Sequence, residues 1–167
     1  MFIHEITLKN FLSYGETSTP LPLKQLNVFI GPNGSGKSNL LEAIELLRSA
    51  PEQFLKPIRE GGGVREWLRK SDSQGTPVAT LDAVICYPEG NQNLRYAISF
   101  TATGPQFEIT DERIENEKPD PSRRTRDNKP YFFYEYDNGR PYRRDGTDGT
   151  PSRILFLFSC RLIGKLV

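Results

Sequence analysis

Cysteine, histidine, methionine and tryptophan are scarce in this 167-residue chain, with two, one, one and one copies. Cys86 and Cys160 lie far apart without the spacing of metal ligands. This excludes a disulfide scaffold or a zinc cluster and fits a reducing compartment. The single histidine, His4, excludes any site that needs two imidazoles, and we expect it to be a polar residue of an N-terminal strand.

Long hydrophobic runs and a strong net charge are also missing. The longest apolar run, residues 154–158, is far shorter than the roughly 18 residues of a membrane helix, and residues 1–5 lack the basic start of a signal peptide. We therefore predict a soluble, cytoplasmic chain with no membrane contact. Lys and Arg number 22 against 21 Asp and Glu, which argues against a basic arm or an acidic tail that selects partners.

The first sixty residues predict alternating strand and helix. Residues 2–11 alternate apolar and polar side chains, as a strand does, and residues 13–22 are rich in turn-forming types. Residues 26–30 form a short, mostly apolar run that predicts a strand buried on both faces and ended by Gly31. Apolar residues then recur at helical spacing over residues 37–50 up to Pro51, followed by a short helical piece around residues 54–58.

The rest of the chain predicts β structure. Residues 61–77 hold the Gly61-Gly62-Gly63 loop and a short helix candidate at residues 64–70. Four segments are rich in β-branched and aromatic residues and are separated by turn signals: residues 78–87, 94–101, 106–114 and 131–136. Their close spacing predicts an antiparallel meander within residues 78–150. Residues 117–130 predict an exposed loop, and residues 151–167 form an atypical apolar tail.

One motif carries chemistry. Residues 31–38 match G-x-x-x-x-G-K-[ST], and we assign the phosphate site to this motif and the next residue: Gly31, Pro32, Asn33, Gly34, Ser35, Gly36, Lys37, Ser38 and Asn39. Glycines let successive backbone N–H groups point at a polyphosphate, and the following helix adds its positive end. Lys37 can reach the outer phosphates and the Ser38 hydroxyl can ligate Mg²⁺. The plain alternative is a Gly-rich turn that only caps a helix.

Two segments resemble a known group. Residues 6–14, Ile-Thr-Leu-Lys-Asn-Phe-Leu-Ser-Tyr, look like the first strand of the RecF/SMC-like ATPases, the ABC-type branch of the P-loop proteins. Residues 26–44 are similar to their Walker A segment, with Asn33 in the motif and Asn-Leu-Leu-Glu-Ala-Ile after Ser38. The resemblance covers about the first fifty residues. The later strands agree with the group's small β subdomain only in their general β-rich character.

The resemblance implies an α/β P-loop NTPase fold. Residues 1–60 would form the N-terminal ATPase lobe, and the antiparallel β subdomain would follow at residues 78–150. Two heads would sandwich ATP, so a homodimer or a partner ATPase chain is implied, in DNA repair and maintenance or anti-phage defence. ATP and Mg²⁺ would be the cofactors, with the phosphates on residues 33–39 and the adenine near residues 9–13. For Lys9, a solvated strand residue is the favoured alternative.

The parts needed for hydrolysis are not found in the sequence. No apolar run is followed by Asp-Glu, there is no Leu-Ser-Gly-Gly-type signature, no Gln follows Gln106, and His4 precedes the motif. We therefore assign no catalytic residue. We expect the chain to carry only the N-terminal part of such a head, through a premature stop or frameshift near Pro151. A split protein whose partner chain provides the acids is the alternative. Apolar surface beside residues 26–30 would then be exposed.

Other candidates are weaker. Arginines and aromatic residues between residues 123 and 144 could track a nucleic-acid backbone, but interleaved aspartates favour a β-hairpin with a solvated loop. Glu42, Glu45 and Glu60 are expected to be surface charges, and Trp67 to pack rather than stack on a ligand. A non-catalytic nucleotide-binding fragment or regulatory subunit remains an alternative function. A P-loop phosphotransferase is disfavoured because a β meander follows where a helical lid would be expected.

Overall fold

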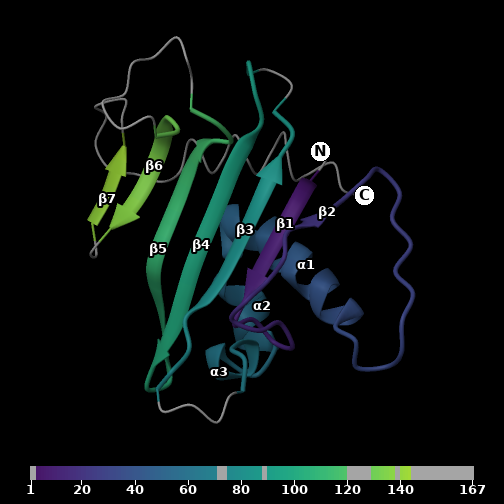
Figure 1. Cartoon of the computed structure of the whole chain (residues 1–167). Coiled ribbons are helices and arrows are strands. Elements are labelled where there is room, and N and C mark those ends of the chain that lie inside the picture. Colours follow the sequence, from purple (N-terminus) through teal and green to yellow (C-terminus); the bar gives the residue numbers. More distant parts are fainter. Residues whose placement is uncertain (1–2, 71–74, 88–89, 120–128, 138–139, 144–167) are drawn as a thin grey trace.

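A single antiparallel sheet organises the chain in the computed structural model, which describes residues 3–70, 75–87, 90–119, 129–137 and 140–143. The described strands follow the order β2-β1-β3-β4-β5-β6-β7, and every neighbouring pair is antiparallel. They are β1 (Ile3–Lys9), β2 (Leu21–Pro22), β3 (Ala79–Ile85), β4 (Leu94–Thr103), β5 (Gln106–Asn116), β6 (Phe132–Asp137) and β7 (Arg140–Arg143). The helices are α1 (Lys37–Gln53), α2 (Leu55–Glu60) and α3 (Val64–Trp67), and Figure 1 shows them behind one face of the sheet.

The meander predicted from the sequence is confirmed. The strands expected at residues 2–11, 78–87, 94–101, 106–114 and 131–136 are present as β1, β3, β4, β5 and β6, with ends shifted by a few residues. The predicted Gly104-Pro105 turn joins β4 to β5. The turn expected at residues 138–139 lies outside the described residues, and β7 pairs with β6 as the favoured hairpin interpretation requires.

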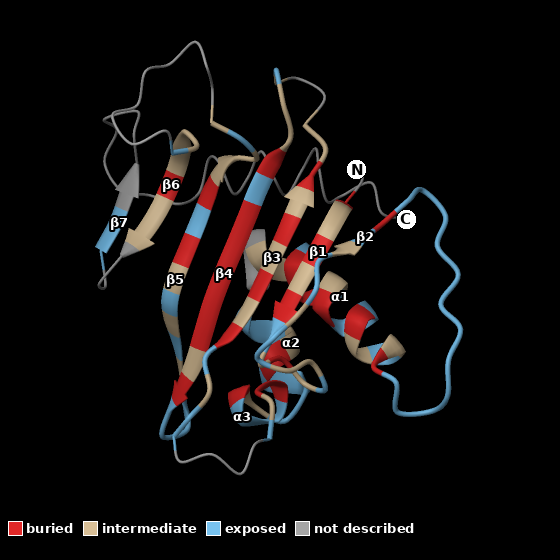
Figure 2. Ribbon diagram, in the orientation of Figure 1, coloured by how far each residue is buried: buried red, intermediate tan, exposed pale blue. Residues whose placement is uncertain are grey.

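The core lies between the sheet and the helices, as the burial colours of Figure 2 show. The core-facing side chains of strand β4 are all buried: Leu94, Tyr96, Ile98, Phe100 and Ala102. On its other face, Ala97 and Ser99 are buried as well. Helix α1 supplies the opposite wall, with Leu40, Ala43, Leu46 and Leu47 at helical spacing. Trp67 is buried with its ring centroid 5.8 Å from that of Phe11, so its predicted role in the core is confirmed.

A β-bulge changes which residues of β5 face the core. Ser99 pairs with Asp111 while Phe100 pairs with Ile109, so Thr110 is the extra residue. Phe107 and Ile109 pack against the core before the bulge, whereas Glu112 and Ile114 are buried after it. The bulge therefore places a carboxyl group, that of Glu112, among buried side chains.

The buried strand predicted for residues 26–30 is wrong. The segment has no strand assignment and lies in the long connection between β2 and α1 that swings away from the sheet in Figure 1. Leu26, Val28 and Ile30 are 82%, 76% and 92% exposed. A strand needs a neighbour that takes up its backbone hydrogen bonds, and the described sheet ends at β2. The expectation that apolar surface is left exposed here is confirmed.

Two helix boundaries also differ from the prediction. Helix α1 continues through Pro51 to Gln53, and after Phe54 the chain enters α2 almost without a break. A proline near a helix end forgoes only one backbone bond, here to the carbonyl of Leu47, so it did not end the helix. Helix α3 is shorter than the predicted residues 64–70, because Leu68 leaves it to form a β-bridge with Phe11. No helix among the described residues is long and apolar enough to cross a bilayer.

Candidate functional site

The motif residues form a tight loop that leads directly into α1. Gly34 and Gly36 have φ angles of 81° and 89°, a left-handed conformation that glycine adopts without strain. Space is also limited at Gly36, where a Cβ atom would lie 2.9 Å from Ser13 Oγ. Glycine is thus required at Gly36 by backbone conformation and by a close neighbour.

Lys37 lies across this loop. Its Nζ donates hydrogen bonds of 2.8 Å to the carbonyl oxygens of Gly31 and Pro32, and one of 3.1 Å to Ser35 Oγ. The loop therefore holds an exposed ammonium group at its centre. A phosphate oxygen is a stronger partner for an ammonium group than a neutral carbonyl, so an anion can exchange with these bonds.

The start of α1 adds donors at the same place. Leu40 N bonds to Gly36 O at 3.0 Å, which closes the first helical turn. The N–H groups of Lys37, Ser38 and Asn39 precede that bond and belong to the first turn, whose donors have no partner within the helix. The helix dipole favours negative charge at this end.

A magnesium ion would have few protein ligands here. Among the described residues, no group of three or more His, Cys, Asp or Glu side chains could hold a metal. The Ser38 hydroxyl, in the first turn of α1, is the protein oxygen that fits the predicted role, and phosphate oxygens would complete the shell. Such a site would form only with a nucleotide bound.

The loop after β1, residues 10–15, lies directly against the motif. Asn39 Nδ2 donates to Ser13 Oγ at 2.8 Å, and Tyr14 OH donates to Gly36 O at 3.2 Å. Burial raises the pKa of Tyr14 above its ordinary value, so its hydroxyl stays a donor. Sequence reasoning expected residues 9–13 near the nucleotide, and the structure brings Ser13 to Asn39. It missed Tyr14, which follows the predicted region by one residue.

Arg69 is a second residue that sequence reasoning missed. Its Nη1 donates a 2.9 Å hydrogen bond to the Ser13 carbonyl oxygen. With Ser13, Asn39 and Glu66 it lines a hollow of about 370 Å³ beside the phosphate loop. No local pattern could have found this contact, because Ser13 and Arg69 are 56 residues apart in the chain.

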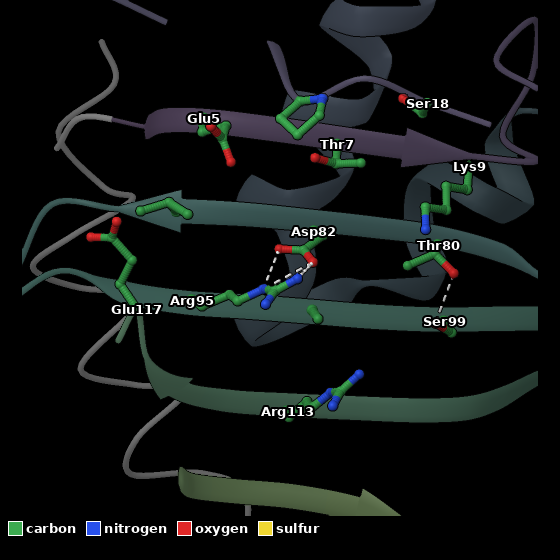
Figure 3. A pocket seen from close by; sticks show the side chains of 13 residues that line it. Glu5, Thr7, Lys9, Ser18, Thr80, Asp82, Arg95, Ser99, Arg113 and Glu117 are labelled. Atoms are coloured by element: carbon green, nitrogen blue, oxygen red, sulfur yellow. Dashed lines mark hydrogen bonds and ion pairs between the residues drawn. The ribbon is translucent and has the colours of Figure 1, made fainter. Parts of the chain in front are cut away.

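Lys9 lies on the other face of the sheet. It lines a hollow of about 620 Å³ on the face away from the helices, shown in Figure 3. Arg95 reaches Asp82 with two nitrogens, and Thr80 and Ser99 share a 2.9 Å hydrogen bond across the floor.

The charges of this hollow balance. Three cationic side chains, Lys9, Arg95 and Arg113, face three anionic ones, Glu5, Asp82 and Glu117. A polar, solvated face is usual for an antiparallel sheet covered on one side only. The phosphate loop, where cation and helix end point at one place, is therefore the stronger candidate.

The buried ionisable cluster lies apart from both places. Glu112, 8% exposed, accepts a 2.7 Å hydrogen bond from Tyr96 OH. Desolvation raises the pKa of Glu112, although the hydrogen bonds from Tyr96 and Tyr134 act in the other direction. The groups that act on Glu112 are Tyr96, Tyr134 and Asp111, which do not belong to the phosphate loop.

Comparison with known proteins identifies the family. The sequence profile of the AAA ATPase domain matches residues 1–124. The chain belongs to the AAA ATPase domain family. The profile covers the phosphate loop and most of the meander, so the family membership applies to the candidate site and to the sheet together.

The similar proteins agree with the RecF/SMC-like resemblance, which is confirmed. DNA replication and repair protein RecF of Leptospira biflexa is 45% identical over 60 residues, 36% of this chain and 15% of that protein. Chromosome partition protein Smc of Mycobacterium tuberculosis is 29% identical over 85 residues, 51% of this chain and 7% of that protein. The matched part therefore spans less than a sixth of these relatives.

A solved structure shows the same fold. It comes from work on "ATP-driven dimerization and DNA stimulated activation of SMC ATPases". It matches with a TM-score of 0.52 at 18% identity, over 95% of this chain and 78% of that chain. The P-loop NTPase fold predicted from the sequence is thereby confirmed.

Proposed function

We propose that the chain binds Mg-ATP through its phosphate loop, as part of an ATPase head. The observation that carries the proposal is the position of Lys37, whose ammonium group lies 2.8 Å from two loop carbonyls at the start of α1. A cation, the N–H groups of the first turn of α1 and the helix dipole lie close together and favour a polyphosphate over other ligands. Gly31 through Asn39 would hold the phosphates and Ser38 the Mg²⁺.

The nucleoside half of ATP would lie beside residues 10–15. The hollow of about 370 Å³ next to Ser13 and Asn39 is adjacent to the phosphate loop. Its lining includes the Leu12 and Leu68 side chains and the polar groups of Glu66, Arg69 and Lys70. An apolar wall with a few polar groups suits a base and a ribose.

Hydrolysis would require a second contributor. The sequence offers no acidic pair after an apolar strand, and hydrolysis needs an acid for Mg²⁺ and a group that positions water. We propose that a partner ATPase chain supplies these groups and pairs apolar strands with residues 26–30, because a second copy of this sequence would lack the same acids. Support comes from the exposure of Leu26, Val28 and Ile30, at 82%, 76% and 92%.

DNA maintenance in the cytoplasm is the proposed setting, because the relatives are named for DNA replication and repair and for chromosome partition. Anti-phage defence is a second candidate setting. The second candidate function is a non-catalytic nucleotide-binding subunit, favoured by the absence of an acidic pair after an apolar run in this sequence.

Binding and turnover measurements test these proposals separately. Titration of the purified chain with ATP in the presence of Mg²⁺ is expected to show saturable binding, which weakens when Mg²⁺ is removed by EDTA. No saturable binding at millimolar ATP would refute the proposal. Phosphate release by the chain alone, lost in Lys37→Ala, would favour the enzyme over the non-catalytic subunit. Binding without release would agree with the need for a second contributor to hydrolysis.

A further inference from the structure

The loop formed by residues 10–15, named the clasp here, is held in a strained conformation against the phosphate loop. Asn10 and Leu12 have φ angles of 48° and 49°, values that are rare for residues other than glycine. Left-handed residues of this kind persist only where surrounding contacts fix them, and they cluster at functional sites. The contacts that fix the clasp therefore indicate its role.

Those contacts come from the segment around α3. Trp67 O accepts a 3.0 Å hydrogen bond from Leu12 N, and Arg69 N donates to Asn10 O at 2.8 Å. Phe11, fully buried, packs its ring against Trp67 at 5.8 Å. Two backbone hydrogen bonds and one buried aromatic pair thus attach the clasp to the segment around α3.

Arg69 braces the clasp with its side chain as well. Its Nη1 donates to Ser13 O at 2.9 Å, and the same nitrogen lies 3.5 Å from the position that a Cβ on Gly15 would occupy. The guanidinium group therefore lies close against the turn formed by residues 13–15. The two side chains of that turn, Ser13 and Tyr14, are the ones that reach the phosphate loop.

The bond from Tyr14 has a direct consequence for the phosphate site. The trans peptide that joins Gly36 to Lys37 is planar, so its C=O and N–H point in opposite directions. Tyr14 OH and Leu40 N both bond to Gly36 O, which fixes the direction of the carbonyl. The same bonds then fix the direction of the Lys37 N–H, a donor in the first turn of α1.

The bond from Ser13 acts further along the same turn. Asn39 Nδ2 donates to Ser13 Oγ, so the amide side chain of Asn39 is held against the clasp. Tyr14 therefore contacts the N-cap of α1, Gly36, and Ser13 contacts Asn39 in its first turn. The clasp thus contacts Gly36 and Asn39, which belong to the proposed phosphate site.

We propose that Tyr14, Ser13 and Arg69 are positioning residues, which orient the phosphate loop and the first turn of α1 for a polyphosphate ligand. The inference rests on the proposed function. Because the clasp acts on the phosphate end, it should influence every ligand with a polyphosphate group, whether or not that ligand carries a base.

The test measures the dissociation constants of Mg-ATP and of Mg-tripolyphosphate for wild type, Tyr14→Phe and Arg69→Met. Tyr14→Phe removes one hydroxyl and keeps the ring, and Arg69→Met keeps an apolar stem but removes the donor. Tyr14→Phe is expected to bind both ligands about three- to tenfold more weakly, on the scale of one lost hydrogen bond. Arg69→Met is expected to weaken ATP binding at least as much as tripolyphosphate binding, because Arg69 also lines the hollow proposed for the nucleoside. The double variant should lose less than the product of the two effects, because both act through the clasp.

A matched control is Tyr87→Phe, at the opposite end of β1 and β3, since Ile85 pairs with Ile3 there. It should bind both ligands as wild type does. Thermal melts accompany each variant, and if Arg69→Met melts early, Tyr14→Phe decides the question.

Three outcomes overturn the inference. Equal affinities of wild type and Tyr14→Phe for both ligands would show that the clasp does not position the loop. Weaker ATP binding with unchanged tripolyphosphate binding would show that these side chains contact the nucleoside instead. If wild type binds neither ligand, the proposed function itself fails and the inference falls with it.

Discussion

Asn39 Nδ2 donates a 2.8 Å hydrogen bond to Ser13 Oγ, which joins the first turn of α1 to the loop after β1. The two residues are 26 positions apart, and the long exposed connection with residues 26–30 lies between them. The phosphate loop is thus fixed from β1 and the α3 segment rather than from the strand expected before it.

Gly36→Ala should destabilise the protein and weaken ATP binding. An L side chain in the left-handed region costs about 1–2 kcal/mol, and the φ angle of Gly36 is 89°. A Cβ there would also lie 2.9 Å from Ser13 Oγ, which is held by Asn39. The free energy of unfolding, measured by urea denaturation, should therefore fall by more than the backbone effect alone.

Gly34→Ala is the matched control, because Gly34 has a φ angle of 81° but, apart from its two chain neighbours, no described residue has a heavy atom within 4 Å of the point where a Cβ would lie. This variant should show the stability loss caused by the left-handed backbone, without the added loss caused by a close contact such as that of Gly36 with Ser13. Equal losses of stability in the two variants would contradict the close approach of Ser13 to Gly36.

Glu112→Gln should stabilise the protein at neutral pH. Desolvation raises the pKa of Glu112 above its ordinary value, so the folded state disfavours the ionised carboxylate. The resulting loss of folding stability is absent below the ordinary pKa of a glutamate. It grows as the pH rises from there through the raised pKa. Glutamine keeps an oxygen that can accept the Tyr96 hydroxyl and never ionises.

Urea denaturation of wild type and Glu112→Gln from about pH 4 to pH 8 checks this sign. The free energies of unfolding of wild type and Glu112→Gln should differ least at the acid end. The variant should become more stable than wild type as the pH rises. Tyr134 and Asp111 also act on Glu112, so both are kept unchanged in the comparison. A difference that shrinks toward neutral pH would contradict the assignment.

Replacing the exposed apolar side chains of residues 26–30 should reduce self-association. Leu26, Val28 and Ile30 are 82%, 76% and 92% exposed, and contiguous apolar surface of this kind promotes association. The triple variant Leu26→Ser, Val28→Thr, Ile30→Thr should sediment as smaller species than wild type in analytical ultracentrifugation. Its melting temperature should be unchanged, because the segment contributes no buried side chain.

The control for this variant changes apolar residues that are less exposed. Leu55 and Val78 are 39% and 41% exposed and lie outside the segment. Leu55→Ser with Val78→Thr should leave the sedimentation of the wild type unchanged. Sedimentation of the triple variant like that of wild type would exclude residues 26–30 as the association surface.

The fold could be predicted where the pattern of one segment decides the structure. The β-branched and aromatic residues of segment 94–101 predicted a strand, and β4 is present there as Leu94–Thr103. The motif likewise fixed the start of α1 at Lys37, because its glycines and the apolar spacing after them agree. Such signals are local, so a single sequence contains them.

Residues 26–30 show where this reasoning stops. An apolar run indicates that a segment needs burial, but not which neighbour provides it, and the described sheet provides none. Pro51 shows the same limit for helices, because apolar spacing on both sides of it outweighed one lost backbone bond. The contacts of Ser13 with Asn39 and Arg69 depend on the arrangement of β1, α1 and α3, which no segment specifies alone.

Titration of Mg-ATP into wild type and Lys37→Ala tests the central claim most directly. Lys37 Nζ holds the centre of the loop through Gly31 O and Pro32 O, and a hydrogen bond between charged groups contributes more than a neutral one. Lys56→Ala, on α2, is the control for loss of a lysine. The account predicts saturable binding by wild type and Lys56→Ala, and affinity weaker by about tenfold or more for Lys37→Ala. Equal affinity of wild type and Lys37→Ala for Mg-ATP would contradict it.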